Sequence, residues 1–146
     1  MSALFGLKEE IQMAKIGFIG MGNMGYAMLK GVLSVFSKEE IVFTDVNSDV
    51  MERVTKETGV MHMQSNAECA NSAKYIILAV KPQFYGAVTK NIKNIVKSDN
   101  VIISIAPGIS IESLREALDF EARIVRAMPN TPALLGEGMT GVCYDQ

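Results

Sequence analysis

The sequence of 146 residues predicts an α/β fold, in which helices cover both faces of a doubly wound, mostly parallel sheet. Three observations lead to this prediction. Short apolar runs alternate with segments of helical periodicity, these runs are apolar enough to be covered on both faces, and a glycine-rich turn follows the first of them. The composition is that of a globular chain, with 49% hydrophobic and 21% charged residues.

The expected elements alternate along the chain. Strands are expected at 15–19, 41–44, 60–63, 75–80, 101–105, 123–127 and 138–144. Helices are expected at 23–36, 49–58, 84–96 and 110–118, with a helical turn at 68–72. Local chemistry predicts some of their ends: Gly59 is the C-cap of the second helix, Pro82 ends the fourth strand and Ser110 caps the last helix.

The glycine-rich turn reads Gly20-Met21-Gly22-Asn23-Met24-Gly25, between a strand and a helix. In a dinucleotide-binding turn, the first glycine allows the tight turn, the second lets a pyrophosphate approach the backbone, and the third lets the helix pack on the sheet. The free N–H groups at the start of the helix would face the anion. This context predicts the dinucleotide-binding arrangement known as the Rossmann fold, against the alternative of a glycine turn without a ligand.

Asp45 follows the second strand, 20 residues beyond Gly25. An acidic residue at this place accepts hydrogen bonds from the adenosine ribose and repels the 2′-phosphate of NADP. The nearest arginine, Arg53, does not follow directly, so the sequence favours NADH among the NAD(P)H cofactors. The alternative is that Asp45 only begins the next helix through an Asx turn.

Charge and cysteine usage exclude several other classes of protein. The 16 acidic and 14 basic residues give a formal charge of −2, so no basic surface for nucleic acid is indicated. No apolar run reaches the length of a membrane span. Cys69 and Cys143 have neither disulfide nor metal spacing, and His62, the single histidine, has no evident ligand partner. We expect a cytoplasmic protein that holds no metal.

Two later segments, Ala79-Val80-Lys81-Pro82-Gln83 and Arg126-Ala127-Met128-Pro129-Asn130-Thr131-Pro132, are more specific than the glycine turn. Together with that turn they closely resemble the pyrroline-5-carboxylate reductases, and the resemblance runs from Met13 to the end of the chain. It implies the Rossmann fold and NAD(P)H-dependent reduction of 1-pyrroline-5-carboxylate to L-proline, the last step of proline biosynthesis.

The resemblance also implies site residues. Contacts with the cofactor are expected from Gly20, Met21, Gly22, Asn23, Met24, Gly25, Asp45, Asn66, Ala79, Val80, Lys81, Pro82, Ala106 and Gly108. The substrate ring is expected beside Met128, Pro129, Asn130 and Thr131. Plainer alternatives stay open, because Lys81 could be a solvated charge, Pro129 could only shape a turn and Asn130 could only satisfy loop backbone groups.

Members of this family carry a second, helical domain, which supplies the dimer interface and much of the substrate pocket. We therefore expect residues 13–146 to be the dinucleotide-binding domain, with the catalytic residues and the contacts of a homo-oligomer in a domain that this sequence lacks. Residues 1–12 are expected to be an extension or an alternative start. The other interpretation is an N-terminal helix packed on the domain, since Leu4, Leu7 and Ile11 fall at helical spacing.

Two other functions compete with this one. A β-hydroxyacid dehydrogenase or a related imine reductase would share the glycine turn and usually differ in the later segments. A non-enzymatic module that senses NAD(H) would bind the dinucleotide without needing the segment from Met128 to Pro132.

Overall fold

The computed structural model describes residues 13–119, 121–129 and 141–144. Its strands are β1 (Ala14–Ile19), β2 (Ile41–Thr44), β3 (Met61–His62), β4 (Ala73–Leu78), β5 (Val101–Ser104), β6 (Arg123–Met128) and β7 (Gly141–Tyr144). Its helices are α1 (Asn23–Val32), α2 (Ser48–Thr58), α3 (Asn66–Ser72), α4 (Tyr85–Ile92) and α5 (Ile111–Leu118), with 3₁₀ turns η1 (Lys38–Glu40) and η2 (Pro82–Phe84).

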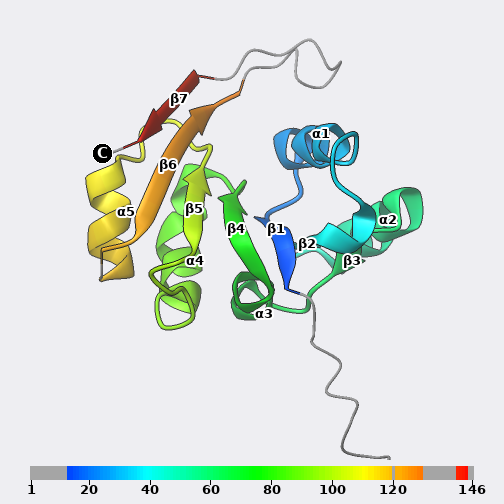
Figure 1. The fold of residues 1–146 in the computed structure, drawn as a ribbon, viewed down its shortest axis with the longest axis horizontal. Coiled ribbons are helices and arrows are strands. Elements are labelled where there is room, and N and C mark those ends of the chain that lie inside the picture. The colour runs from blue at the N-terminus through cyan, green and yellow to red at the C-terminus, as the bar shows by residue number, and fades with distance from the viewer. Residues whose placement is uncertain (1–12, 120, 130–140, 145–146) are drawn as a thin grey trace, which may run out of the picture.

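Within these residues the strands form a single sheet in the order β3-β2-β1-β4-β5-β6-β7 (Figure 1). All neighbours pair in parallel from β3 to β6, and β7 pairs antiparallel with β6, with Tyr144 opposite Val125. The order reverses between β1 and β4, and ligands of doubly wound sheets bind at the carboxyl ends of the strands at such a point. The predicted doubly wound, mostly parallel sheet is confirmed.

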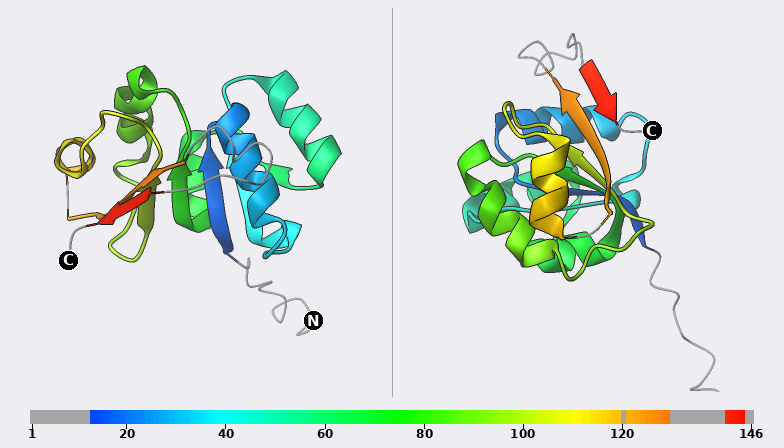
Figure 2. Two further views of the ribbon diagram at one scale, coloured as in Figure 1. Left: turned by 90° about the horizontal axis from the view of Figure 1, so that it is seen from above. Right: turned by 90° about the vertical axis from the view of Figure 1, so that its left-hand side faces the viewer.

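Separate apolar cores lie on the two faces of the sheet. On one face, Leu29 of α1 and Val54 of α2 are fully buried against Phe18 and Phe43 of the strands. The other core includes side chains of α3, α4 and α5, among them Cys69, Ile92 and Leu114. Helices α4 and α5 pack side by side on this face (Figure 2).

Helix α3 is longer than the helical turn predicted at 68–72. It begins at Asn66 because the hydroxyl of Ser65 accepts a hydrogen bond from the N–H of Glu68 at 3.0 Å. It also lies very close to β1, where a Cβ on Gly17 would be 3.2 Å from the Cys69 sulfur. The missing side chain at Gly17 therefore lets this short helix pack directly on the sheet.

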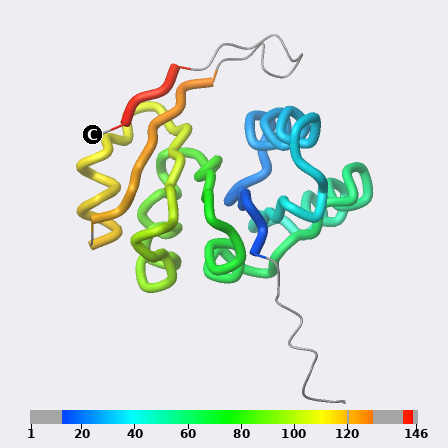
Figure 3. The backbone as a smooth tube through the Cα atoms, in the orientation of Figure 1, coloured from blue at the N-terminus to red at the C-terminus, as the bar shows by residue number. Residues whose placement is uncertain are grey.

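Two predicted helices end earlier than their apolar periodicity indicates. The helix expected at 23–36 ends at Val32, after which the Ser34 hydroxyl donates to the Gly31 carbonyl and the chain continues in turns, as the smooth trace in Figure 3 shows. The helix expected at 84–96 becomes η2 followed by α4, which stops at Ile92. In both cases local hydrogen bonds in turns replace the helical ladder while apolar residues beyond it still reach the core.

The strand predicted at 75–80 runs instead from Ala73 to Leu78, because backbone pairing with β1 begins at Ala73 and does not follow the apolar run. The strand predicted at 60–63 is shorter, since only Met61 and His62 pair with β2. Residues 138–140 lie outside the described part, and 141–144 form β7 as expected. None of the described helices is long and apolar enough to cross a membrane.

The predicted caps at Gly59 and Ser110 are confirmed. Gly59 ends α2 in the left-handed conformation, with φ of +75°. The Ser110 hydroxyl accepts a hydrogen bond from the N–H of Ser113 at the start of α5.

Candidate functional site

The turn between β1 and α1 can be formed only with glycine at its first position. Gly20 has φ of +97°, and a Cβ there would lie 2.8 Å from the backbone carbonyl group of Ala79. The N–H of Gly20 donates to the Thr44 carbonyl oxygen at 2.9 Å. The chain therefore leaves β1 while still bonded to β2 and pressed against the end of β4.

The other two glycines of the turn differ from each other. A Cβ on Gly25 would lie 2.7 Å from the carbonyl oxygen of Gly20, so this position holds α1 close to the turn. A Cβ on Gly22 would have no described heavy atom within 4 Å, and Gly22 has an ordinary φ of −74°. Packing thus explains Gly20 and Gly25, whereas Gly22 keeps open the space in front of the N-terminus of α1, where an anion can approach.

Asp45 joins this turn to the loop after β2. One of its carboxylate oxygens accepts the N–H of Met21 at 2.8 Å, and the other accepts the N–H of Asn47 at 2.9 Å. The second bond is the Asx turn that the sequence left open, and Asn47 itself caps α2 through the N–H groups of Asp49 and Val50. Each carboxylate oxygen can still accept a further hydrogen bond from a ligand hydroxyl.

A pocket of about 190 Å³ lies beside Asp45 at the carboxyl ends of β1 and β2. Its lining consists of Ile19, Gly20, Asp45, Val46, Asn66, Val80, Phe84, Ala87, Val88 and Asn91. The structure thus brings together four residues that the sequence assigns to the cofactor, namely Gly20, Asp45, Asn66 and Val80.

The walls of this pocket include residues that sequence reasoning missed. Val46 is fully exposed and Phe84 is 54% exposed, although both side chains are apolar. The Nδ2 of Asn66 donates to the Oδ1 of Asn91 at 3.2 Å, which places two amides at the pocket lining. Phe84 and Asn91 lie in the segment predicted as a helix, and nothing in its periodicity marks them as pocket residues, whereas an apolar Val46 directly after Asp45 was a usable signal.

The remaining predicted cofactor residues lie in the turns after β1, β4 and β5 and outside this pocket. Asn23 is exposed and Met24 half-buried on α1, Lys81 and Pro82 are exposed at η2, Ala79 is half-buried, Ala106 is buried, and Gly108 is exposed with φ of +77°. Met21 is 2% exposed and packs in the core, so only its backbone faces the site.

At the predicted substrate side, Met128 ends β6 and is 42% exposed, and Pro129 follows it half-buried. Asn130 and Thr131 lie outside the described residues.

A buried hydroxyl supports the ends of β4 and β5 from behind. The Tyr85 hydroxyl donates to the Leu78 carbonyl oxygen and lies 2.9 Å from the Ser104 hydroxyl oxygen. Burial raises the pKa of Tyr85, which keeps this hydroxyl neutral and able to donate. In the described ranges, no group of three histidine, cysteine or acidic side chains could hold a metal ion.

Comparison with known proteins fits this geometry. Residues 15–108 match the family described as NADP oxidoreductase, coenzyme F420-dependent. The chain belongs to this family.

Within this family, the resemblance to the pyrroline-5-carboxylate reductases is confirmed. The chain is 39% identical over 131 residues to the pyrroline-5-carboxylate reductase of Escherichia coli. The aligned residues cover 88% of this chain and 48% of that protein. It is 35% identical over 130 residues to that of Methanosarcina acetivorans, with the same two coverages. The chain thus spans about half the length of the curated relatives it matches.

Solved structures give the same picture. The pyrroline-5-carboxylate reductase of Coxiella burnetii is similar with a TM-score of 0.86 and 31% identity, over 92% of this chain and 50% of that one. The Plasmodium falciparum enzyme, solved with NADP bound, has a TM-score of 0.79 and 36% identity, over 91% of this chain and 48% of that one. A 3-hydroxyisobutyrate dehydrogenase of Mycobacterium tuberculosis, at 16% identity and a TM-score of 0.76, shares the fold.

Proposed function

We propose that this chain is the dinucleotide-binding part of a pyrroline-5-carboxylate reductase, which reduces 1-pyrroline-5-carboxylate to L-proline with NAD(P)H. The observation that carries the proposal is the open space at Gly22, in front of α1 and on the same sheet edge as the pocket beside Asp45. The relatives at 35–39% identity support the choice of reaction.

The described residues suit each part of a dinucleotide. The backbone from Gly20 to Gly25 would hold the pyrophosphate, because Gly22 leaves it free access to the N-terminus of α1. The pocket would hold the adenosine, with the apolar side chains of Val46 and Phe84 against the flat faces of the base and the amides of Asn66 and Asn91 near its polar edge.

The nicotinamide end would lie beside Ala106, Gly108, Met128 and Pro129, with Asn130 and Thr131 near the substrate ring. When bound, the nicotinamide supplies a hydride to the carbon of the cyclic C=N bond. The chain's own residues would orient the two rings and exclude water, since the side chains of Ala106, Met128 and Pro129 are apolar. None of the six residues placed at this end has a side chain that titrates near neutral pH. We therefore propose that the proton for the imine nitrogen comes from another part of the protein or from solvent.

We further propose that Asp45 selects NADH over NADPH. Its carboxylate lines the pocket, accepts two backbone N–H groups and retains lone pairs for the ribose hydroxyls, while its charge would repel a 2′-phosphate. Arg53, the nearest arginine in the sequence, has its guanidinium 5.7 Å from the centre of the Tyr26 ring, where it packs against α1. The Plasmodium relative was solved with NADP, so the proposed preference for NADH is argued from Asp45 of this chain and not from the relatives.

Calorimetric titration of the chain with NADH and with NADPH tests both proposals. We expect saturable binding of both, with NADH tighter, and a smaller NADH preference for Asp45→Asn. Asp49→Asn is the matched control, because it removes the same charge from the first turn of α2, outside the pocket. Tighter NADPH binding by the unchanged chain would contradict the role of Asp45, and binding of neither would contradict the cofactor site.

A substrate panel separates the reaction from its alternatives. We expect this chain alone to bind nucleotide and to form little proline, and a longer protein that includes it to reduce 1-pyrroline-5-carboxylate in preference to β-hydroxyacids. Asn130→Ala should then lower turnover and leave NADH binding intact, whereas a module that only senses NAD(H) would lose nothing. Preferred oxidation of a β-hydroxyacid would support the dehydrogenase alternative instead.

We also propose a reducing, cytoplasmic setting, in keeping with Cys69 and Cys143, both of which are free thiols.

A further inference from the structure

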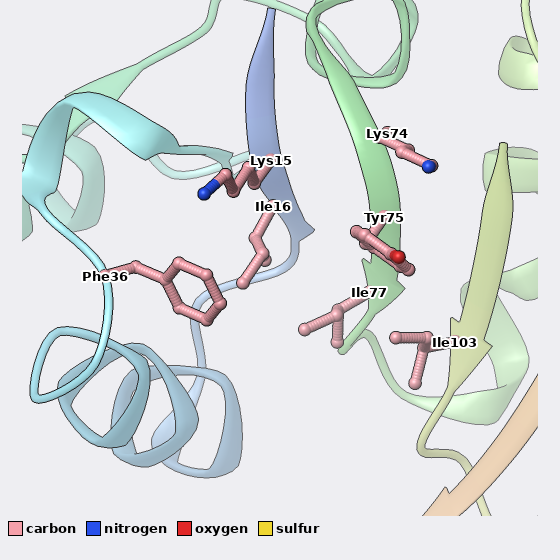
Figure 4. A pocket seen from close by; sticks show the side chains of 7 residues that line it. All are labelled: Lys15, Ile16, Phe36, Lys74, Tyr75, Ile77 and Ile103. Atoms are coloured by element: carbon pink, nitrogen blue, oxygen red, sulfur yellow. The ribbon is translucent and has the colours of Figure 1, made fainter.

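An apolar groove crosses the sheet on the face that carries α1 and α2 (Figure 4). Its floor consists of Ile16 of β1, Tyr75 and Ile77 of β4 and Ile103 of β5, and Phe36 forms one side. Its volume is about 530 Å³. The groove crosses the strands from Lys15 and Lys74 near their amino ends to Ile77 and Ile103, the next-to-last residues of β4 and β5. It shares no lining residue with the pocket beside Asp45, so the two are separate.

The floor of the groove is unusual for the middle of a parallel sheet. Strands β1 and β4 are central in the sheet, and central parallel strands are normally covered on both faces. Helices α1 and α2 provide the buried helical side chains of the core on this face, yet Tyr75 is still 38% exposed. Ile16 and Ile77 of the floor are already buried, so a further apolar element on this face would cover Tyr75 in particular.

We propose that residues 1–12 of the chain pack into this groove. They join the described chain at Met13, directly before Lys15 and Ile16, which line it. A helix of 12 residues is about 18 Å long. Neighbouring strands are about 4.8 Å apart, so such a helix can cross from β1 over β4 to β5.

The chemistry of residues 1–12 complements that of the groove. Leu4, Leu7 and Ile11 form an apolar stripe at helical spacing, which suits a floor of isoleucines and one tyrosine. Glu9 and Glu10 in the same segment carry negative charge, and the lining includes two lysines.

The lysine on β4 is available for such a contact. Lys15 already pairs with Glu40 at 2.6 Å. Lys74 forms no ion pair among the described residues, and its ammonium lies 5.6 Å from the centre of the Tyr75 ring. An acidic side chain of the N-terminal segment can therefore pair with Lys74 at the edge of the groove.

A single tryptophan reports on this contact, because the sequence contains none. Leu7→Trp places the reporter on the apolar stripe, and Lys8→Trp, one residue further and about 100° around a helix, is the matched control. We expect Trp at position 7 to emit at shorter wavelength and to be quenched by acrylamide several-fold less than Trp at position 8.

Substitutions in the groove then test whether the groove is what protects Trp at position 7 from acrylamide. Tyr75→Glu, at an already exposed side chain, should make Trp at position 7 as quenchable as Trp at position 8, and Lys74→Glu should weaken its protection. NADH titration of both variants should match that of the unchanged chain and so report intact folding, because neither Tyr75 nor Lys74 lines the pocket beside Asp45.

Equal quenching at positions 7 and 8 would overturn the proposal, as would protection that persists in Tyr75→Glu. Protection that appears only at concentrations where sedimentation shows a dimer would assign the groove to a second copy of the chain. If Trp at position 7 loses its protection from acrylamide when the chain is joined to the remainder of a longer protein, the groove would be assigned to that remainder. Both of these outcomes also contradict the proposal.

Discussion

Replacing Gly22 by alanine should separate cofactor binding from folding, and this is the sharpest test of the site. The added Cβ meets no described heavy atom within 4 Å, and the backbone at Gly22 has a φ of −74° that alanine adopts freely. The same Cβ would project into the space that we assign to the pyrophosphate. The substitution should therefore leave the fold intact and obstruct the ligand.

The expected change in the free energy of unfolding for Gly22→Ala is small because two effects oppose each other. Alanine restricts the unfolded chain, which stabilises by about 0.4–1 kcal/mol. Gly22 is also the N-cap of α1, where alanine is less favourable than glycine by an amount of about the same size. We expect a net change within about 0.5 kcal/mol and a loss of NADH affinity of at least tenfold, which corresponds to about 1.4 kcal/mol.

Gly25→Ala is the matched comparison within the same turn. Its Cβ would lie 2.7 Å from the Gly20 carbonyl oxygen, a backbone atom that cannot move aside alone. Overpacking of this kind costs about 1–3 kcal/mol. Urea unfolding measures the stability of both variants, and calorimetry measures their NADH affinity.

The reasoning predicts opposite patterns for the two variants. Gly22→Ala should unfold at the same urea concentration as the unchanged chain and bind NADH poorly, whereas Gly25→Ala should unfold at lower urea. Unchanged NADH affinity in Gly22→Ala would refute the assignment of that space to the cofactor. Equal destabilisation by both substitutions would refute the packing argument.

Further predictions concern stability. Burial raises the pKa of the Cys69 thiol from 9.0 to about 12, so the unfolded chain loses this proton first and the free energy of unfolding should fall as the pH rises above 9. Cys69→Ala should flatten that fall between pH 9 and 10 in urea unfolding, and an unchanged slope would contradict it. Tyr85→Phe removes the buried hydroxyl that donates to the Leu78 carbonyl oxygen and should cost about 1–2 kcal/mol by the same assay, whereas no loss would contradict this role. Ser110→Ala should cost about 1 kcal/mol through the lost cap of α5, and Ser113→Ala, which keeps the capped N–H, should cost clearly less, so equal losses would contradict the cap.

The alternation of strands and helices could be predicted because it depends on nearby residues. Apolar runs indicate buried strands, and the caps at Gly59 and Ser110 act within one helical turn of their helix. The glycine turn could likewise be recognised from the sequence, because a strand before it and a helix after it identify it as a dinucleotide-binding turn.

The interior of the site was only partly predictable. The glycine motif and its spacing placed Gly20 and Asp45 at the cofactor, and the family resemblance added Asn66 and Val80. All four line one pocket. Phe84 escaped notice because a 3₁₀ turn, which the apolar periodicity does not reveal, turns it toward residues that lie far away in the sequence.

The sequence by itself thus determined the order and kind of the elements and the chemistry of the glycine turn, because hydrophobic periodicity, capping and backbone freedom are local properties. Tertiary structure decided the contacts that join distant parts of the chain. The carboxylate of Asp45 reaches the N–H of Met21 across 24 positions, and the thiol of Cys69 reaches the Phe18 carbonyl across 51. Such contacts depend on which strands become neighbours, and the sheet order that sets this is a property of the whole packed chain.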